Sequence, residues 1–334
     1  MTLILWIIIF IVSLALLVKS SDWFVGSAEK IGLALKISPF IVGVTIVAIG
    51  TSFPELASSL AAVLKGAGEI VAADAVGSNI ANIFLIVGIS AVLARTLIVK
   101  RSLIDLDAPL LAATTGLFAF IIWDRTIVLA EGILLLAAFV VYLLYTIFQR
   151  RELEEVQIPE AEVLPSRVER RRQKLELEET GKPVVRLDFK VFFFLILGMA
   201  GLAVGANYTI ESVVQISKIL NISTGLIAIT AIALGTSLPE LVVSARAALK
   251  KKYEIALGNI FGSNVFNILL VVGIPALIRP LAVDDLTFKI GLPFMVMATL
   301  LFVISGISRR IHIWEGLMYL LFYALFIIKL CGLF

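Results

Sequence analysis

The sequence predicts an all-α membrane protein with ten transmembrane helices, arranged as two five-helix repeats of inverted topology. The first observation is composition: 60% of the 334 residues are hydrophobic and 16% are charged, far from the balance of a soluble domain. The second is that apolar runs long enough to span a bilayer recur along the whole chain. The third is an internal repeat, because residues 50–88 and 235–273 share 20 identities in 39 aligned positions, at an offset of 185 residues.

Ten apolar segments are expected to cross the membrane. The first has no basic residues ahead of it and is too long for the apolar core of a signal peptide, so we expect it to be retained as a span. The ten segments are 2–18, 37–64, 69–94, 104–123, 127–148, 190–208, 222–249, 255–279, 286–307 and 313–331.

The polar segment 149–189, dense in Arg, Lys and Glu, divides these spans into two groups of five. We expect residues 1–148 to form the first repeat, 149–189 a solvated linker and 190–334 the second repeat. Five is an odd number, so the two halves must insert with opposite orientations. Inverted repeats are the architecture of secondary transporters, whose binding site lies at the repeat interface near the bilayer midplane. Duplication also occurs in channels and membrane enzymes, so both alternatives stay open at this point.

The distribution of basic residues predicts the topology. With ten spans, 22 of the 28 Lys and Arg residues fall on one side of the membrane, and the positive-inside rule makes that side cytoplasmic. The linker 149–189 is then cytoplasmic and both termini are extracellular. The compact size favours a prokaryotic plasma membrane. The single cysteine, Cys331, excludes a disulfide framework, and the lone His312 beside two arginines fits an interfacial residue.

A polar hexapeptide occurs twice at membrane depth, as GTSFPE at 50–55 and as GTSLPE at 235–240. Pro54 has no N–H to donate and its ring crowds residue 50, so the carbonyl of Gly50 loses its helical partner. Non-helical backbone at this depth is tolerated where it is buried in protein or lines a cavity, and carbonyls freed there are good cation ligands. A glutamate inside a span indicates a functional site by default.

Hydroxyl groups accompany each glutamate on the same helix face. Thr51 and Ser52 lie four and three residues before Glu55, so their side chains converge within about one turn. The second copy repeats this arrangement with Thr236, Ser237 and Glu240.

A second motif follows in the next span of each half, GSNIAN at 77–82 and GSNVFN at 262–267. The spacing i,i+4 lets the first Ser and the last Asn of each motif face inward together, and both offer oxygen atoms. These residues are Ser78, Asn82, Ser263 and Asn267. The middle asparagines, Asn79 and Asn264, are expected nearer the edge of the site. Four more polar residues are expected near span ends that water can reach, namely Asp22, Asp74, Asp124 and Glu131.

The ligand inventory is two carboxylates with hydroxyl, amide and backbone oxygens, and neither thiol nor imidazole lies near them in the sequence. Oxygen ligands suit hard cations such as Ca²⁺ and Na⁺ and argue against zinc or copper. Two glutamates match the charge of one Ca²⁺. Burying an unpaired carboxylate costs several kcal/mol, so the empty site is expected to take up cations or protons.

The doubled Gly-Thr-Ser-x-Pro-Glu followed by Gly-Ser-Asn-x-x-Asn resembles the α-repeats of the calcium/cation antiporter superfamily, particularly the prokaryotic-type sodium/calcium exchangers. The resemblance covers nearly the whole chain. It implies that Glu55 and Glu240 hold a central Ca²⁺ with help from Thr51 and Thr236. It also implies Na⁺ ligands from serines and from two backbone carbonyls, and a cage completed by asparagines: Ser52, Ser237, Ser78, Ser263, Ala48, Ala233, Asn82 and Asn267.

The resemblance implies a secondary antiporter that exchanges Na⁺ for Ca²⁺ by alternating access, with long first and sixth spans that slide across the core. The transported ions and the lipid bilayer are then its partners, and neither a cofactor nor a nucleic acid is expected. Proton-coupled exchange and K⁺-dependent exchange are the nearest alternatives. Asn267 leans against K⁺ co-transport, since K⁺-dependent relatives rely on an acid there. A cation channel and an intramembrane enzyme are more distant alternatives.

Overall fold

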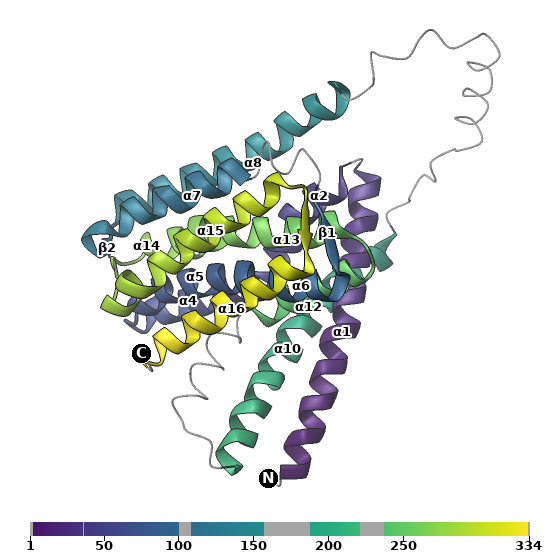
Figure 1. The fold of residues 1–334 in the computed structure, drawn as a ribbon, viewed down its shortest axis with the longest axis horizontal. Coiled ribbons are helices and arrows are strands. Elements are labelled where there is room, and N and C mark those ends of the chain that lie inside the picture. Colours follow the sequence, from purple (N-terminus) through teal and green to yellow (C-terminus); the bar gives the residue numbers. More distant parts are fainter. Residues whose placement is uncertain (1–2, 36, 100–107, 157–187, 221–236, 333–334) are drawn as a thin grey trace, which may run out of the picture.

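The computed structural model describes residues 3–35, 37–99, 108–156, 188–220 and 237–332, and these residues are almost entirely helical (Figure 1). Within them, seven helices are long and apolar enough to cross a membrane, or eight if one bent pair is a single span. The expected seventh span, 222–249, is described only from Ser237 onward, and most of the expected linker lies outside the described residues.

Three helices run further than the apolar pattern predicts. α1 (Leu3–Ala34) continues well past residue 18, α10 (Phe189–Ile219) past residue 208 and α8 (Leu129–Val156) past residue 148. Hydropathy falls at Lys19 and Asp22, yet neither residue interrupts a backbone helix, and the sequence supplies no proline there. The helices therefore extend beyond the spans expected from hydropathy at these three ends.

α1 and α10 form an antiparallel pair that stands beside the rest of the molecule (Figure 1). Their backbones approach closely because α10 presents glycines to α1. A Cβ atom at any of these glycines would lie within 3 Å of an α1 atom, and the positions are Gly198, Gly201 and Gly205. A hydrogen bond from Thr209 Oγ1 to Ser13 Oγ, 2.8 Å long, joins the same two helices.

Two broken helices form the centre of the molecule. The first consists of α5 (Glu69–Ile80), the π-helix η2 (Ala81–Val87) and α6 (Gly88–Ala94), and its most apolar stretch is 72% buried. The second consists of α13 (Tyr253–Phe266), η5 (Asn267–Val271) and α14 (Gly273–Ala276), and is 94% buried. The corresponding fraction for α1, α8 and α16 (Ile313–Leu330) is 22%. The polar motifs GSNIAN and GSNVFN therefore lie on the two most buried helices.

The helix that carries the first hexapeptide is bent by 40° at Ser52. Its N-terminal part comprises α2 (Pro39–Val42), η1 (Gly43–Val47) and α3 (Ala48–Thr51), and α4 (Phe53–Leu64) follows. The backbone ladder stops with Ser52 N to Ala48 O at 2.9 Å and resumes with Leu56 N to Ser52 O at 3.2 Å. The break lies where Pro54 removes an N–H donor, as the sequence predicts.

The second hexapeptide begins its helix in the same way. α12 (Leu238–Leu249) has its proline and glutamate in the first turn, as α4 does. Ser237, which precedes α12, has φ −85° and ψ 4°, and Ser52 has φ −89° and ψ 5°. Two serines 185 residues apart therefore share one backbone conformation at the start of equivalent helices.

Two short antiparallel ribbons tie the halves of the chain together. β1 (Thr96–Ile98) pairs with β4 (Arg310–His312), and β2 (Thr126–Ile127) pairs with β3 (Leu281–Ala282). Among the remaining helices, α7 (Ala108–Ile121), which continues into the short η4 (Ile122–Asp124), packs on α15 (Leu292–Ile307) beyond the π-helix η6 (Thr287–Gly291). Asp124 and Glu131 accept backbone N–H groups at exposed helix ends, which confirms their expected placement.

Candidate cation site

The two glutamates are buried at the ends of helices from different halves of the chain. Glu55 in α4 and Glu240 in α12 are each 1% exposed. Both lie in the first turn of their helix, where the partial positive charge of the helix N-terminus favours a carboxylate. The two carboxylates interact electrostatically with each other. The arrangement therefore concentrates negative charge inside the protein.

One hydrogen bond links the halves directly at these glutamates. Ser52 Oγ donates to Glu240 Oε1 over 2.9 Å. Both carboxylate oxygens of Glu55, and Oε2 of Glu240, have no hydrogen-bond partner among the described residues. A buried acceptor without a donor costs about 1–3 kcal/mol, and more when it is charged. These carboxylate oxygens therefore call for a cation or a proton as their partner.

The buried asparagines and serines add further oxygens. Four of the predicted asparagine and serine ligands have an oxygen that lacks a hydrogen-bond partner within the described part of the chain: Asn82, Asn267, Ser237 and Ser263. Ser78 is buried as well. α4 contacts η5 and α12 contacts η2, so the helix that starts at each glutamate packs against the asparagine segment of the other half. The structure brings these predicted residues together in one buried region.

The middle asparagines lie in this region too, and not at its edge as expected. Asn79 Nδ2 donates to the carbonyl of Asn264 at 3.2 Å, and Asn82 Nδ2 donates to Asn264 Oδ1 at 3.4 Å. Both middle residues are almost completely buried. The expectation failed because helical spacing does not show that two helices cross at these residues.

Asn259 is a polar residue of this region that sequence reasoning missed. Its side chain is fully buried and bonded to two hydroxyl groups. The signal that could have found it is its alignment with the half-buried acid Asp74, which interacts electrostatically with both glutamates.

Close helix packing places Thr51 beside α13. A Cβ atom at Gly258 would lie 2.7 Å from the carbonyl oxygen of Phe40, and one at Gly262 would lie 2.4 Å from that of Val44. The Gly-x-x-x-Gly spacing thus lets α2 and η1 pack directly on α13. Thr51 and the carbonyl of Ala48, at the end of the same segment, are consequently held inside the protein.

Two predicted ligands, Thr236 and the carbonyl of Ala233, lie outside the described residues. The other ten predicted site residues are described. All ten are buried, with exposed fractions of 4% or less.

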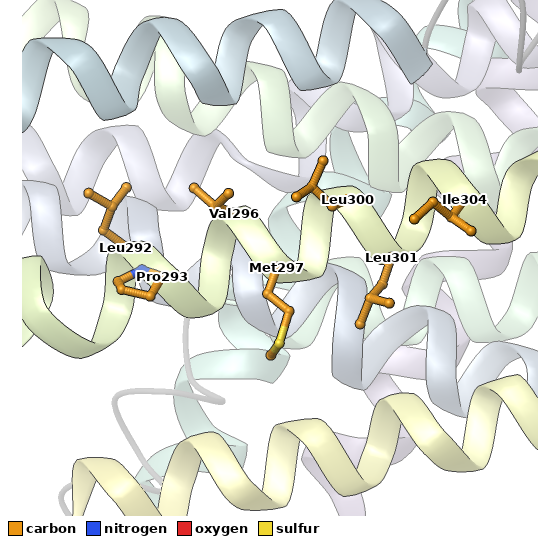
Figure 2. Close-up of a pocket in the computed structure, with 7 residues that line it drawn as sticks. All are labelled: Leu292, Pro293, Val296, Met297, Leu300, Leu301 and Ile304. Carbon is orange, nitrogen blue, oxygen red and sulfur yellow. The ribbon is translucent and has the colours of Figure 1, made fainter.

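An apolar hollow on α15 lies apart from this polar region. Its lining residues, Leu292, Pro293, Val296, Met297, Leu300, Leu301 and Ile304, point from one helix (Figure 2). Leu300 and Ile304 are more than half exposed. Aliphatic side chains cannot coordinate a cation, so this hollow is not part of the candidate site.

The chain is similar in sequence and fold to known proteins of one family. The chain matches the sodium/calcium exchanger protein family over residues 5–148 and 190–331. It belongs to the sodium/calcium exchanger family. This family member is 34% identical to the sodium/calcium exchanger MaX1 of Methanosarcina acetivorans, with 97% of each chain covered. It is 33% identical to the inner membrane protein YrbG of Escherichia coli, over 87% of this chain and 86% of that one.

A solved structure has the same fold. The sodium-calcium exchanger NCX_Mj, soaked with zero Na⁺ and Ca²⁺, superimposes with a TM-score of 0.78 at 29% identity, covering 98% of this chain and 100% of that one. The family consists of transporters, so the intramembrane enzyme considered from the sequence is excluded. The protein is a helical, multi-pass membrane protein of the exchanger fold.

Proposed function

We propose that this protein exchanges Na⁺ for Ca²⁺ by alternating access, with Glu55 and Glu240 at the centre of its cation site. Family membership supports the reaction. The observation that carries the site is the carboxylate of Glu55, which is buried and has no hydrogen-bond partner among the described residues for either oxygen. Such a group needs a cation, and the oxygens around it are hard ligands.

In this proposal, Glu55 and Glu240 bind the central Ca²⁺ together with Thr51 and Thr236. Na⁺ binds at oxygens of serines and backbone carbonyls, and asparagines complete the cage: Ser52, Ser237, Ser78, Ser263, Ala48, Ala233, Asn82 and Asn267. Because two carboxylates are neutralised by one Ca²⁺ or by several Na⁺, the two kinds of cation compete. That competition is what couples their movement in opposite directions.

The proposed architecture is ten spans in two inverted five-helix repeats, residues 1–148 and 190–334, joined by the linker 149–189. The two ribbons support it. The offset of 185 that relates the hexapeptides also relates β1 to β3 and β2 to β4, so the pairings β1–β4 and β2–β3 are equivalent. The family match likewise omits 149–189. α1 and α10, two long helices that pack mainly against each other, are the elements proposed to slide.

We propose the plasma membrane as the location, with the linker in the cytoplasm and both termini outside. The bias of 22 of 28 Lys and Arg residues to one side supports the orientation. The similarity to an inner membrane protein of a bacterium supports the location.

The test is radiolabelled Ca²⁺ uptake into proteoliposomes that hold the purified protein. We expect uptake to follow an imposed outward Na⁺ gradient and to be abolished by Glu55→Gln and by Glu240→Gln. The matched control is Glu69→Gln, because Glu69 is exposed in the first turn of α5. Uptake that follows a pH gradient without Na⁺ would identify H⁺ as the coupling ion in place of Na⁺. Uptake that requires K⁺ would indicate K⁺-dependent exchange. Flux without obligatory exchange would indicate a channel.

A further inference from the structure

Asn259 connects two hydroxyl groups from different helices at the edge of the proposed cation site. Its Oδ1 accepts a hydrogen bond from Thr51 Oγ1 at 3.1 Å, and its Nδ2 donates to Ser244 Oγ at 2.9 Å. All three side chains are at most 1% exposed. Thr51 ends α3, Ser244 lies in α12 and Asn259 lies in α13. The three residues thus form a buried chain across three helices.

The direction of this chain follows from its far end. Ser244 Oγ directs its one proton to the carbonyl of Ala256, 3.5 Å away. A hydroxyl has a single proton, so Ser244 can only accept from Asn259. The amide group of Asn259 therefore faces Ser244 with its NH₂ and faces Thr51 with its oxygen.

Thr51 has one proton and several acceptors within reach, because the Glu240 carboxylate also interacts with its hydroxyl. Its Oγ1 lies 3.1 Å from Asn259 Oδ1 and 3.3 Å from the carbonyl oxygen of Ala48. A bond to Ala48 would be the common back-bond of a helical hydroxyl, and it would occupy a carbonyl oxygen that the proposed site uses for Na⁺. A bond to Asn259 leaves that carbonyl free and turns the lone pairs of Thr51 toward a cation.

We propose that Asn259 is a positioning residue of the cation site, which accepts the hydrogen bond of the Thr51 hydroxyl and thereby presents Thr51 Oγ1 and the Ala48 carbonyl to cations. The inference rests on the proposed function, because it concerns the ligands of that site. The first repeat holds Asp74 at the equivalent position, and a carboxylate is also an acceptor. The side chains at this position in both halves can therefore accept a hydrogen bond from a hydroxyl group.

The test compares Asn259→Leu, which removes the acceptor at similar size, with Asn259→Asp, which keeps an acceptor oxygen. Two quantities are measured: the Ca²⁺ concentration for half-maximal uptake into proteoliposomes, and the Ca²⁺-dependent rise in thermal unfolding temperature of the purified protein in Na⁺-free buffer. We expect Asn259→Leu to raise the Ca²⁺ concentration needed for half of the full effect by about tenfold in both measurements, the usual size of an effect through a ligand's supporting group. The maximal rate should stay within about twofold of wild type. For Asn259→Asp, we expect the Ca²⁺ affinity to fall by no more than about threefold relative to wild type.

A double-mutant cycle isolates the path through Thr51. In a Thr51→Val background the hydroxyl is gone, so Asn259→Leu should have no further effect on Ca²⁺ binding. Additive effects of the two substitutions on Ca²⁺ binding would overturn the proposal. Equal losses of Ca²⁺ affinity in Asn259→Leu and Asn259→Asp would overturn it too. So would a lower maximal rate and unfolding temperature of Asn259→Leu with unchanged Ca²⁺ binding. Absence of Na⁺-driven uptake by the wild-type protein would instead contradict the proposed function, while the binding measurement would still judge Asn259.

Discussion

At the scale of single residues, the two glutamates differ although the motifs that carry them match. Glu240 Oε1 accepts a hydrogen bond from Ser52, whereas both oxygens of Glu55 lack a partner among the described residues. Ser52, at the helix break between α3 and α4 in the first half, is therefore hydrogen-bonded to the carboxylate of the second half. A cation that binds at Ser52 must share this hydroxyl with Glu240, so the hydroxyl serves both as ligand and as support.

The first prediction concerns Ser52→Ala. The change removes a proposed Na⁺ ligand and leaves Glu240 Oε1 buried without its donor, at a cost of about 1–2 kcal/mol. We expect the Na⁺ concentration for half-maximal Ca²⁺ release from loaded proteoliposomes to rise, roughly 5- to 30-fold. The matched control is Ser90→Ala in α6, because Ser90 is equally buried and its hydroxyl has no hydrogen-bond partner within the described residues. An equal shift in the control would show that the effect comes from packing.

At the scale of elements, glycines determine where helices can pack closely against one another near the site. A Cβ atom at Gly50 would lie 2.3 Å from the ring of Phe24, so Gly50 is needed for the close approach of α1 as well as for the break at Ser52. Gly258 and Gly262 do the same between η1 and α13. These contacts place the end of α3, and hence Thr51, against Asn259.

The second prediction concerns Gly262→Ala. Its added methyl group would meet the carbonyl oxygen of Val44 and the Cβ of Ala48 at about 2.5 Å, so the helices must separate. Overpacking of this kind costs about 1–3 kcal/mol, and it moves Ala48 and Thr51 away from α13. We expect a lower thermal unfolding temperature and a smaller stabilisation by Ca²⁺. Gly116→Ala in α7, where no atom lies within 4 Å of an added Cβ, should show neither effect, and a loss there would contradict the packing argument.

The break at Ser52 could be predicted from the sequence, while the partners of Asn259 could not. Pro54 removes an N–H donor whatever surrounds it, and an intramembrane glutamate needs a partner in any fold. The environment of Asn259 depends on the approach of η1 to α13, which is set by glycines that hydropathy treats as neutral. The length of α1 was missed for a related reason, because polar residues such as Asp22 end an apolar run without ending a helix.

At the scale of the whole molecule, the ion pairs of the described residues that join the α1–α10 pair to the core lie in the C-terminal half of α1. Asp22 in α1 binds Arg246 at 2.8 Å and Lys250 at 2.7 Å, and Glu29 binds Lys252. The residue equivalent to Asp22 in the other half is the neutral Asn207, and Arg246 corresponds to Ala61. These ion pairs therefore join the first half to the second, and the equivalent positions Asn207 and Ala61 cannot form the matching pair. If α1 and α10 slide, as proposed, these contacts favour the state in which they are formed.

The third prediction follows from that asymmetry and concerns Asp22→Asn. The side chains involved are about one-third exposed, so the pairs contribute roughly 1 kcal/mol after screening by solvent. A bias of that size changes the ratio of the two access states about fivefold. We expect the ratio of the Ca²⁺ affinities at the two membrane faces to change by that factor, measured as half-saturation in right-side-out and inside-out vesicles. High ionic strength should shift the wild-type protein in the same direction.

The matched control for Asp22 is Asp285→Asn. Asp285 lies at the exposed helix start before η6 and pairs with Lys289 and Arg125, and the hydrogen bond from Lys289, with the charge of Arg125, lowers the pKa of Asp285. Its carboxylate is thus ionised at neutral pH, but it does not contact the α1–α10 pair. The same chemical change should leave the affinity ratio unaltered there. An equal change in both variants would mean that net charge, and not the contact between α1 and α12, sets the balance between the two access states.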